Sequence, residues 1–434
     1  MFERQKKGER ALLVLPHARS DGDAVRRADE FAELAKSAGA QVLERITARI
    51  DQPNPRFYLG SGKADEVAAR VEALEADVVL VDHALTPVQE RNLEKHVGAR
   101  VVDRTGLILD IFAQRARSHE GKLEVELAQL KHLATRLVRG WTHLERQRGG
   151  AIGLRGPGET QLETDRRLLG ERVKLLTRRI DKVHTQREQQ RRARLRTTVP
   201  RVALVGYTNA GKSTLFNALT AGSVYAADQL FATLDPTVRR IEGLSCGPAV
   251  LADTVGFIRE LPHDLVAAFR ATLAEARDAD LLLHVSDAAD PERDRLIEVV
   301  NGVLEEIGAA GVPQLHVFNK IDLTDLPPRL ERAGDGRPER VWISAATGAG
   351  LDLLRQALGE RLGGARVRAE LRLPPRAGRL RARLIALGAV ARERHAEDGG
   401  WLLDLDAPQA VLTPLLGDGS AEDARLLRGV LGAR

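Results

Sequence analysis

Residues 206–213 read Gly-Tyr-Thr-Asn-Ala-Gly-Lys-Ser and match the phosphate-loop pattern G-x-x-x-x-G-K-[ST] at every position. The apolar run Val202–Val205 before the loop predicts a strand, and Thr214–Leu219 after it predicts a helix. A strand that leads into a helix aims the N–H groups of the loop and of the helix N-terminus at bound phosphates. We therefore expect a nucleotide-binding α/β domain.

Within this loop each residue type has an expected task. Lys212 is expected to contact the β- and γ-phosphates, and Ser213 to ligate Mg²⁺. The expected phosphate-binding residues are Gly206, Tyr207, Thr208, Asn209, Ala210, Gly211, Lys212, Ser213 and Thr214.

A second motif, Asn319-Lys320-Ile321-Asp322, follows the apolar run Gln314–Phe318, which predicts another strand. Guanine presents two adjacent donors that one carboxylate can accept together, whereas adenine has an acceptor at N1 and no 2-amino group. Asp322 is therefore expected to select guanine, with Lys320 along the base and Asn319 joined to the phosphate loop. The expected base-binding residues are Asn319, Lys320, Ile321, Asp322, Ser344, Ala345 and Ala346, the last three at a further strand end.

Two segments between these motifs are expected to respond to the γ-phosphate. In Asp253-Thr254-Val255-Gly256, Asp253 can hold Mg²⁺ through water and Gly256 can offer its N–H to the γ-phosphate. The preceding segment 231–237 contains two threonines, Thr233 and Thr237, either of which could ligate Mg²⁺. The expected nucleotide contacts in these segments are Phe231, Ala232, Thr233, Leu234, Asp235, Asp253, Thr254, Val255 and Gly256.

The first hundred residues alternate short apolar runs with amphipathic stretches, which is typical of a small parallel α/β domain. The predicted strands are Ala11–Leu15, Val78–Val81 and Arg100–Val102, and the predicted helices are Ala24–Ser37, Ala64–Leu74 and Pro87–His96. Residues 60–63, Gly-Ser-Gly-Lys, resemble part of a phosphate loop, but the leading glycine would fall at Phe57. We interpret them as a turn that opens a helix; an unusual nucleotide contact, as in an RNA-remodelling ATPase, is the alternative.

A helical hairpin is predicted after Thr105. Leucines at three- and four-residue steps, such as Leu123 and Leu127, form one apolar stripe, and Val173, Leu176 and Ile180 belong to a second. The ten residues 149–158 between them include five glycines and one proline and should interrupt the helix.

Positive charge is concentrated in this hairpin. Residues 111–200 carry a net charge of +11, whereas the whole chain carries +5. Such a segment suits contact with structured RNA, because phosphate attraction supplies affinity that does not depend on sequence. The alternatives are a solvated helix pair and, for the arginine-rich stretch 187–196, a membrane surface.

Composition excludes several classes of protein. The chain has 434 residues, 43% of them hydrophobic, which is enough for about three domains of ~150 residues. Cys246 is the single cysteine, so neither an internal disulfide nor a zinc–thiolate cluster is expected. No apolar run approaches the roughly 18 residues that span a bilayer. We expect a cytoplasmic protein that is monomeric in solution.

The order and wording of these motifs resemble the HflX family of translation-associated GTPases, related to the Obg type, over nearly the whole chain. The resemblance is carried by Asp103-Arg104-Thr105 with residues 107–113, by residues 121–123 with 126–130, by residues 155–165, and by Asp253-Thr254-Val255-Gly256-Phe257.

The resemblance implies a fold and a role. The implied organisation is an N-terminal α/β domain (1–104), a helical hairpin with a glycine-rich tip (105–197, tip 149–158), a P-loop GTPase domain with a mostly parallel sheet (198–365) and a small C-terminal α/β domain (366–434). The implied activity is GTP hydrolysis on the large ribosomal subunit, which splits or rescues stalled ribosomes under stress; a checkpoint in large-subunit assembly is the alternative. The implied RNA contacts are Arg148, Gly153, Arg155, Gly156 and Gly158.

The resemblance also bears on catalysis. It favours Thr233 over Thr237 as the Mg²⁺ ligand, which makes Lys212, Thr233 and Gly256 the expected catalytic residues. Many GTPases place a glutamine after the glycine of D-x-x-G to orient the attacking water, but Phe257 stands here and has no hydrogen-bonding group. We expect slow intrinsic hydrolysis that a ribosomal element stimulates. Asn209 resembles the asparagine of potassium-activated relatives, which suggests K⁺ as an activator.

Overall fold

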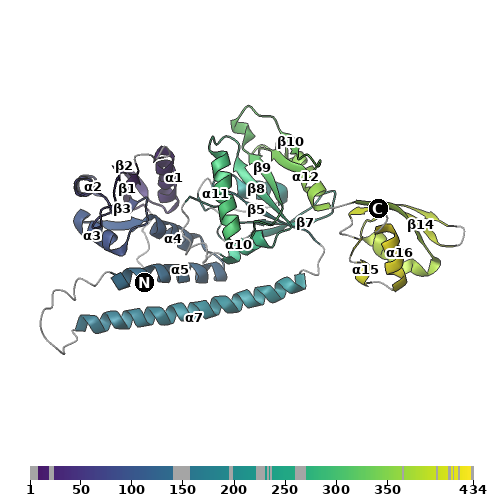
Figure 1. Ribbon diagram of the computed structural model, residues 1–434, viewed down its shortest axis with the longest axis horizontal. Coiled ribbons are helices and arrows are strands. Elements are labelled where there is room, and N and C mark those ends of the chain that lie inside the picture. The colour runs from purple at the N-terminus through teal and green to yellow at the C-terminus, as the bar shows by residue number, and fades with distance from the viewer. Residues whose placement is uncertain are drawn as a thin grey trace. The chain divides into compact units, whose positions relative to one another are not determined.

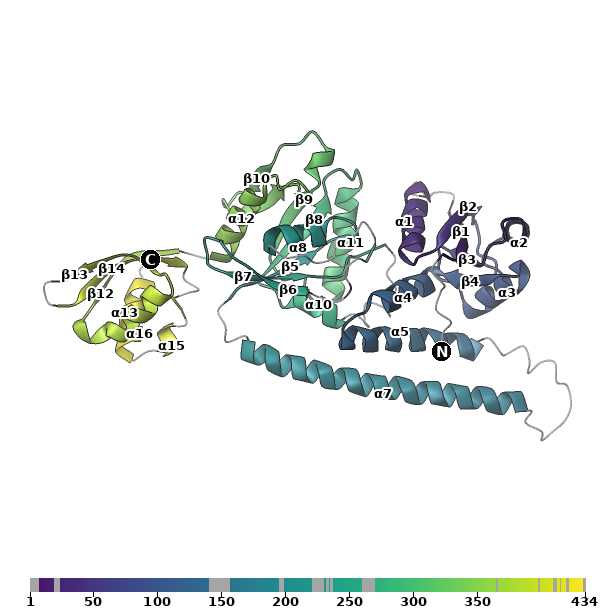
Figure 2. The ribbon, with the colours of Figure 1, turned by 180° about the vertical axis from the view of Figure 1, so that it is seen from behind.

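The computed structural model describes residues 8–18, 24–139, 157–194, 199–220, 230–231, 234, 237–259, 270–363, 366–396, 399–408, 412–413, 415–418 and 421–431 (Figures 1 and 2). The chain forms two compact units, which are described separately below. The first contains residues 1–188, 225–235 and 255–273, and the second contains residues 189–224, 236–254 and 274–434. The described residues of 225–235 and 255–273, which lie between the two nucleotide motifs in sequence, thus belong to the same unit as the N-terminal half of the chain.

The first unit contains a four-stranded parallel sheet in the order β2-β1-β3-β4. Its strands are β1 (Arg10–His17), β2 (Gln41–Arg49), β3 (Val78–Val81) and β4 (Arg100–Asp103), and its helices are α1 (Ala24–Ser37), α2 (Ser61–Leu74), α3 (Pro87–Val97) and α4 (Arg104–Arg115). The central strands β1 and β3 are almost wholly buried, as expected for a parallel sheet that helices cover on both faces. The predicted parallel α/β fold is confirmed.

The turn at Gly60 does open a helix. Gly60 lies in extended conformation at the N-terminus of α2, and its carbonyl accepts hydrogen bonds from the N–H groups of Lys63 and Ala64. The sequence prediction of a helix-opening turn is therefore correct.

Two long helices, α5 (His119–Arg139) and α7 (Pro157–Arg194), follow the sheet and lie side by side in both ribbon views (Figures 1 and 2). Leu123 and Leu127 of α5 pack with Leu176 and Ile180 of α7 in a buried apolar cluster. These are the leucine positions at helical spacing in the sequence, so the predicted helix pairing is confirmed. Helix α7 begins at Pro157, so the last two residues of the stretch 149–158 are helical; proline is favoured in the first turn, where its missing N–H costs no bond.

The second unit is built on a seven-stranded sheet in the order β10-β11-β9-β8-β5-β7-β6. The five central strands are parallel, and the edge strands β6 and β10 are antiparallel to their neighbours. The strands are β5 (Arg201–Val205), β6 (Thr237–Ile241), β7 (Ala249–Asp253), β8 (Leu281–Asp287), β9 (Gln314–Asn319), β10 (Arg329–Arg332) and β11 (Pro338–Trp342). Alternating helices are α8 (Lys212–Thr220), α10 (Arg270–Arg277), α11 (Arg293–Glu306) and α12 (Leu351–Gly363), with a short 3₁₀ turn η1 (Ile321–Leu323).

This sheet is the predicted P-loop architecture. Because β5 lies in the middle, between β7 and β8, the loops that follow these three parallel strands meet at one edge of the sheet. The loop after β9 reaches the same edge, and the loops after β5, β7 and β9 carry motifs that the sequence singled out.

The last part of the chain contains a three-stranded antiparallel sheet in the order β12-β14-β13. Its elements are β12 (Arg366–Leu373), η2 (Pro375–Ala377), α13 (Gly378–Ala386), β13 (Val390–His395), β14 (Trp401–Pro408), α15 (Leu415–Asp418) and α16 (Ala421–Leu431). It has an apolar core of its own, centred on Leu373, Leu384, Leu403 and Leu427. Among the helices of the described residues, none is both long and apolar enough to cross a membrane.

Candidate nucleotide site

The loop between β5 and α8 needs glycine at both glycine positions of its motif, Gly206 and Gly211. Gly206 has φ +146°, and a Cβ there would lie 2.1 Å from the carbonyl oxygen of Val285 on β8. Gly211 has φ +87°, and a Cβ there would lie 2.2 Å from Nδ2 of Asn319. Side chains cannot occupy either position, since backbone and an amide already fill the space. The two glycines thus let the loop pack tightly against β8 and β9.

Lys212 is the first residue of α8 and is buried. Its ammonium group donates to the carbonyl oxygens of Gly206 at 3.0 Å and Tyr207 at 2.6 Å, so the side chain folds back onto the start of the phosphate loop. Burial lowers the pKa of Lys212 to about 8, although the Asp253 carboxylate raises it. A phosphate group bound beside this buried ammonium would stabilise its positive charge, so the site favours an anionic ligand.

Ser213 and Asp253 are brought together from α8 and the end of β7. The Ser213 hydroxyl donates to Oδ2 of Asp253 at 2.9 Å, and Asp253 is fully buried. A hydroxyl and a carboxylate at one point supply the oxygen donors that Mg²⁺ prefers, so the residues present fit the predicted magnesium site. The neighbouring Thr254 donates its hydroxyl to the carbonyl of Leu204 at 2.6 Å, which fixes the end of β7 against β5.

Asn319, the last residue of β9, joins three loops. Its Nδ2 donates to the carbonyl of Ala210 at 2.9 Å, and its Oδ1 accepts from the N–H of Ala345 at 2.8 Å. The phosphate loop and the loop after β11 are therefore tied through one buried amide. Replacement of this side chain by one with only acceptors or only donors would break one of the two bonds.

Ile321 and Asp322 of the Asn-Lys-Ile-Asp motif lie on η1, and Lys320 directly precedes it. Lys320 has φ +68°, and its ammonium group pairs with Asp287 at the end of β8, with Nζ and Oδ2 2.8 Å apart. This contact was missed from the sequence, although a polar residue at the end of a parallel strand is a usable signal. Asp322 is exposed, whereas Ser344 and Ala345 are buried and Ala346 is exposed.

The two segments that were expected to respond to the γ-phosphate are described in part. Phe231 and Leu234 are buried, and so are Val255, Gly256 and Phe257. Phe257 is fully buried, so its ring is not available to solvent. Ala232, Thr233 and Asp235 lie outside the described residues, as do the predicted RNA-contacting residues Arg148, Gly153, Arg155 and Gly156; Gly158 is in α7.

Comparisons with known proteins agree with this geometry. Three protein families match successive parts of the chain: "GTP-binding GTPase N-terminal" at residues 26–113, "GTP-binding GTPase Middle Region" at residues 115–194, and "50S ribosome-binding GTPase" at residues 201–320. GTPase HflX of Escherichia coli (strain K12) is 60% identical over 409 residues, which are 94% of this chain and 96% of the relative. GTPase HflX of Magnetococcus marinus is 48% identical and is covered to 97%, over 96% of this chain.

Among solved structures, a crystal structure of SsGBP in complex with GDP aligns with 80% of this chain and 96% of its own, at 26% identity and a TM-score of 0.47.

Proposed function

We propose that this chain, which belongs to the HflX family of GTPases, hydrolyses GTP on the large ribosomal subunit. Hydrolysis there would split or rescue stalled ribosomes. The chain's membership rests on 60% identity over nearly the whole chain, and it makes the protein a P-loop enzyme that converts GTP to GDP and phosphate. The observation that carries the ribosomal part is the match of residues 201–320 to ribosome-binding GTPases.

The site residues have proposed tasks that follow from their contacts. Lys212 binds the β- and γ-phosphates from its position under the loop, and Asp322, exposed on η1, accepts the two guanine donors. Asn319 holds the phosphate and base loops at a constant separation, so binding of base and phosphates is coupled. Gly256 offers its N–H to the γ-phosphate.

Ser213 and Asp253 are the proposed magnesium-binding residues, with Thr233 as a further ligand. Mg²⁺ bound there would neutralise charge on the β- and γ-phosphates. Asn209, at φ +60° in the phosphate loop, is the proposed ligand for an activating K⁺. Equal hydrolysis rates in sodium and potassium would remove that role.

Phe257 occupies the position at which many GTPases have a glutamine that orients the attacking water. The ring is fully buried and carries no hydrogen-bonding group, so it cannot orient the attacking water as a glutamine would at this position. We infer that a ribosomal group completes the active site and that hydrolysis reports docking. The basic helix pair α5–α7, with its predicted glycine-rich tip, is the part of the chain proposed to contact ribosomal RNA.

Density-gradient sedimentation of a cell extract tests the proposal. With a non-hydrolysable GTP analogue the protein should move with large subunits and the peak of whole ribosomes should shrink; with GDP it should stay near the top. Asp322→Asn is the matched control, because it should not respond to the guanine analogue. Co-sedimentation with precursor subunits alone would favour the assembly-checkpoint alternative, and absence from all ribosomal fractions would refute both.

A further inference from the structure

Two consecutive residues where β4 leads into α4, Asp103 and Arg104, contact different parts of the first unit. Both side chains are nearly inaccessible to solvent, at 2% and 4% exposure. Asp103 faces helix α5, and Arg104 contacts the backbone at Arg259, three residues after Gly256. The pair thus stands between the helix pair and a segment that adjoins the nucleotide motif in sequence.

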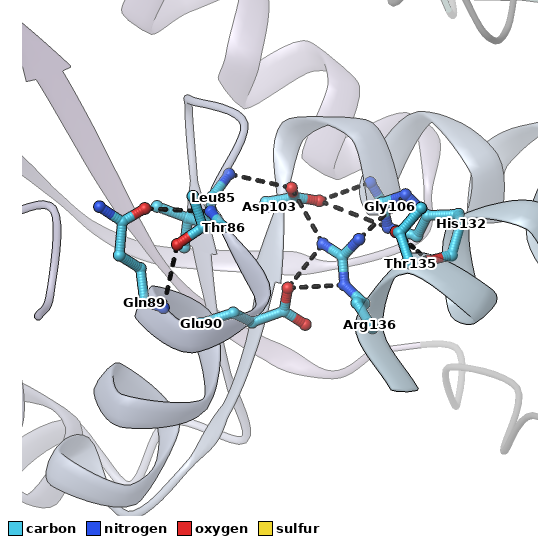
Figure 3. Close-up of polar contacts among 9 residues, drawn as sticks. All are labelled: Leu85, Thr86, Gln89, Glu90, Asp103, Gly106, His132, Thr135 and Arg136. Atoms are coloured by element: carbon cyan, nitrogen blue, oxygen red, sulfur yellow. Dashed lines mark hydrogen bonds and ion pairs between the residues drawn. The ribbon is translucent and has the colours of Figure 1, made fainter. Parts of the chain in front are cut away.

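Asp103 anchors helix α5 (Figure 3). Its Oδ2 accepts from the N–H of Leu85 at 3.1 Å and pairs with Nη2 of Arg136 at 3.0 Å, while its Oδ1 caps α4 through the N–H of Gly106 at 2.8 Å. Arg136 also pairs with Glu90 of α3 at 2.6 Å. Partial burial raises the pKa of the Glu90 carboxyl, although its pairing with Arg136 lowers it. A movement of α5 would therefore act on Asp103 directly.

Arg104 holds the segment after Gly256. Its Nη1 donates to Asp82 at 2.6 Å, and its Nη2 donates both to Glu30 at 2.5 Å and to the carbonyl oxygen of Arg259 at 3.0 Å. The guanidinium is planar and rigid, so its two carboxylate partners fix the direction of the bond to Arg259. This bond depends on the conformation of segment 255–259 and not on the identity of the side chain at 259.

Residues 230–231, at the start of the other segment that is expected to respond to the γ-phosphate, contact helices α1 and α4 of the same unit. The hydroxyl oxygen of the buried Ser37, the last residue of α1, accepts from the N–H of Leu230 at 3.1 Å. Phe231, at φ +57°, meets Phe112 of α4 edge-on with ring centroids 4.7 Å apart. Both segments that adjoin the nucleotide motifs therefore contact the N-terminal sheet domain in one defined conformation.

We propose that Asp103 and Arg104 are positioning residues that couple α5 to segment 255–259. The bound nucleotide then alters the amide exchange of α5, and a displacement of α5 by the ribosome alters the rate of GTP hydrolysis. The two residues are consecutive in the chain and both are buried, so a displacement of one is transmitted to the other through the backbone that joins them. If the bond from Arg104 to the carbonyl of Arg259 forms with GTP and breaks with GDP, or the reverse, it contributes a coupling free energy between the nucleotide site and α5. Such coupling acts equally in both directions. The link from nucleotide to α5 rests on the proposed contact of Gly256 with the γ-phosphate, and the reverse direction also rests on the proposed ribosomal function.

Amide hydrogen exchange of the full chain tests the first direction. With a non-hydrolysable GTP analogue in place of GDP, peptides from α5 should change their exchange rate at least threefold in the wild type, and this change should vanish in Arg104→Lys, which keeps the charge but loses the fork. Arg100→Lys is the matched control on β4, because Arg100 pairs with Glu9, with Nη2 and Oε2 2.7 Å apart. This variant should behave as the wild type. Identical α5 exchange with both nucleotides in the wild type, or a change that persists in Arg104→Lys, would overturn the proposal.

A second variant covers the chance that Arg104→Lys does not fold, which its thermal unfolding reveals. Arg136→Gln breaks the α5 side of the link, and α5 should then lose its response to nucleotide while segment 255–259 keeps its own. A nucleotide response of α5 that survives in Arg136→Gln contradicts the coupling.

Ribosome-stimulated hydrolysis tests the reverse direction. Arg104→Lys and Arg136→Gln should each lower the stimulation by large subunits at least fivefold, and the double variant should be no worse than the more impaired single one, because both break one link. Multiplication of the two effects would show two independent defects and refute the coupling. If the wild type is not stimulated at all, the proposed function fails, and the exchange measurement still decides this inference.

Discussion

At the scale of the residue, the base preference depends on one exposed carboxylate. Asp322→Asn replaces one acceptor oxygen by an NH₂ donor, which opposes the guanine donors and suits the 2-oxo group of xanthine. GTP affinity should fall by at least 100-fold, about 3 kcal/mol, whereas xanthosine triphosphate affinity should rise. Titration calorimetry with both nucleotides measures the change. Retention of wild-type GTP affinity would show that Asp322 does not read the base.

Lys212 predicts a pH dependence of nucleotide binding. The pKa of Lys212 in the nucleotide-free protein is lowered to about 8, and bound phosphates should raise it again. Binding then takes up a proton above about pH 8, so affinity should be nearly constant below pH 7 and fall toward tenfold per pH unit above 8. Titration of a fluorescent GDP between pH 7 and 9 measures this. Lys212→Met should bind weakly without this slope; an equal slope in that variant would exclude Lys212 as its source.

Residues of the nucleotide motifs were predictable because each motif is local in sequence, with its spacing dictated by the phosphates and the base. The contacts of Arg104 with Arg259 and of Ser37 with Leu230 were not predictable, since the partners lie 155 and 193 residues apart in the chain. Nothing in a local pattern shows which backbone carbonyl a buried arginine will reach.

At the scale of the element, α5 and α7 are stabilised by a narrow apolar seam. Leu176 is fully buried in it, whereas its neighbour Leu175 is 41% exposed. Leu176→Ala should lower the local opening free energy of the two helices by about 2–4 kcal/mol, because it leaves a cavity between them. Leu175→Ala should cost less than about 1 kcal/mol. Amide exchange of α5 and α7 measures both; equal effects would refute the seam.

Strand β2 shows where periodicity fails. Its sequence, Gln41–Arg49, places two apolar residues, Val42 and Leu43, before two charged ones, Glu44 and Arg45. It therefore lacks both a regular alternation and the continuous apolar run that marked β1 and β3. It is an edge strand that pairs only with β1 in the sheet order, and one side of it meets solvent. Buried parallel strands are therefore easier to predict than the edge strand beside them.

At the scale of the whole molecule, the two compact units do not follow the order of the motifs. The sequence predicts a GTPase domain at 198–365, and the described residues of segments 225–235 and 255–273 fall in the unit that contains the N-terminal sheet. That division supports the proposal that the N-terminal domain and the helix pair regulate the nucleotide site. The fold class followed from the motifs, but this interleaving depends on long-range packing.

The most direct test of the account is the steady-state rate of GTP hydrolysis at saturating GTP, measured alone, with purified large subunits and with purified small subunits. Because Phe257 cannot orient the attacking water, the free protein should be slow, large subunits should accelerate it at least tenfold, and small subunits should leave it unchanged. A free rate that large subunits do not increase would contradict the central claim.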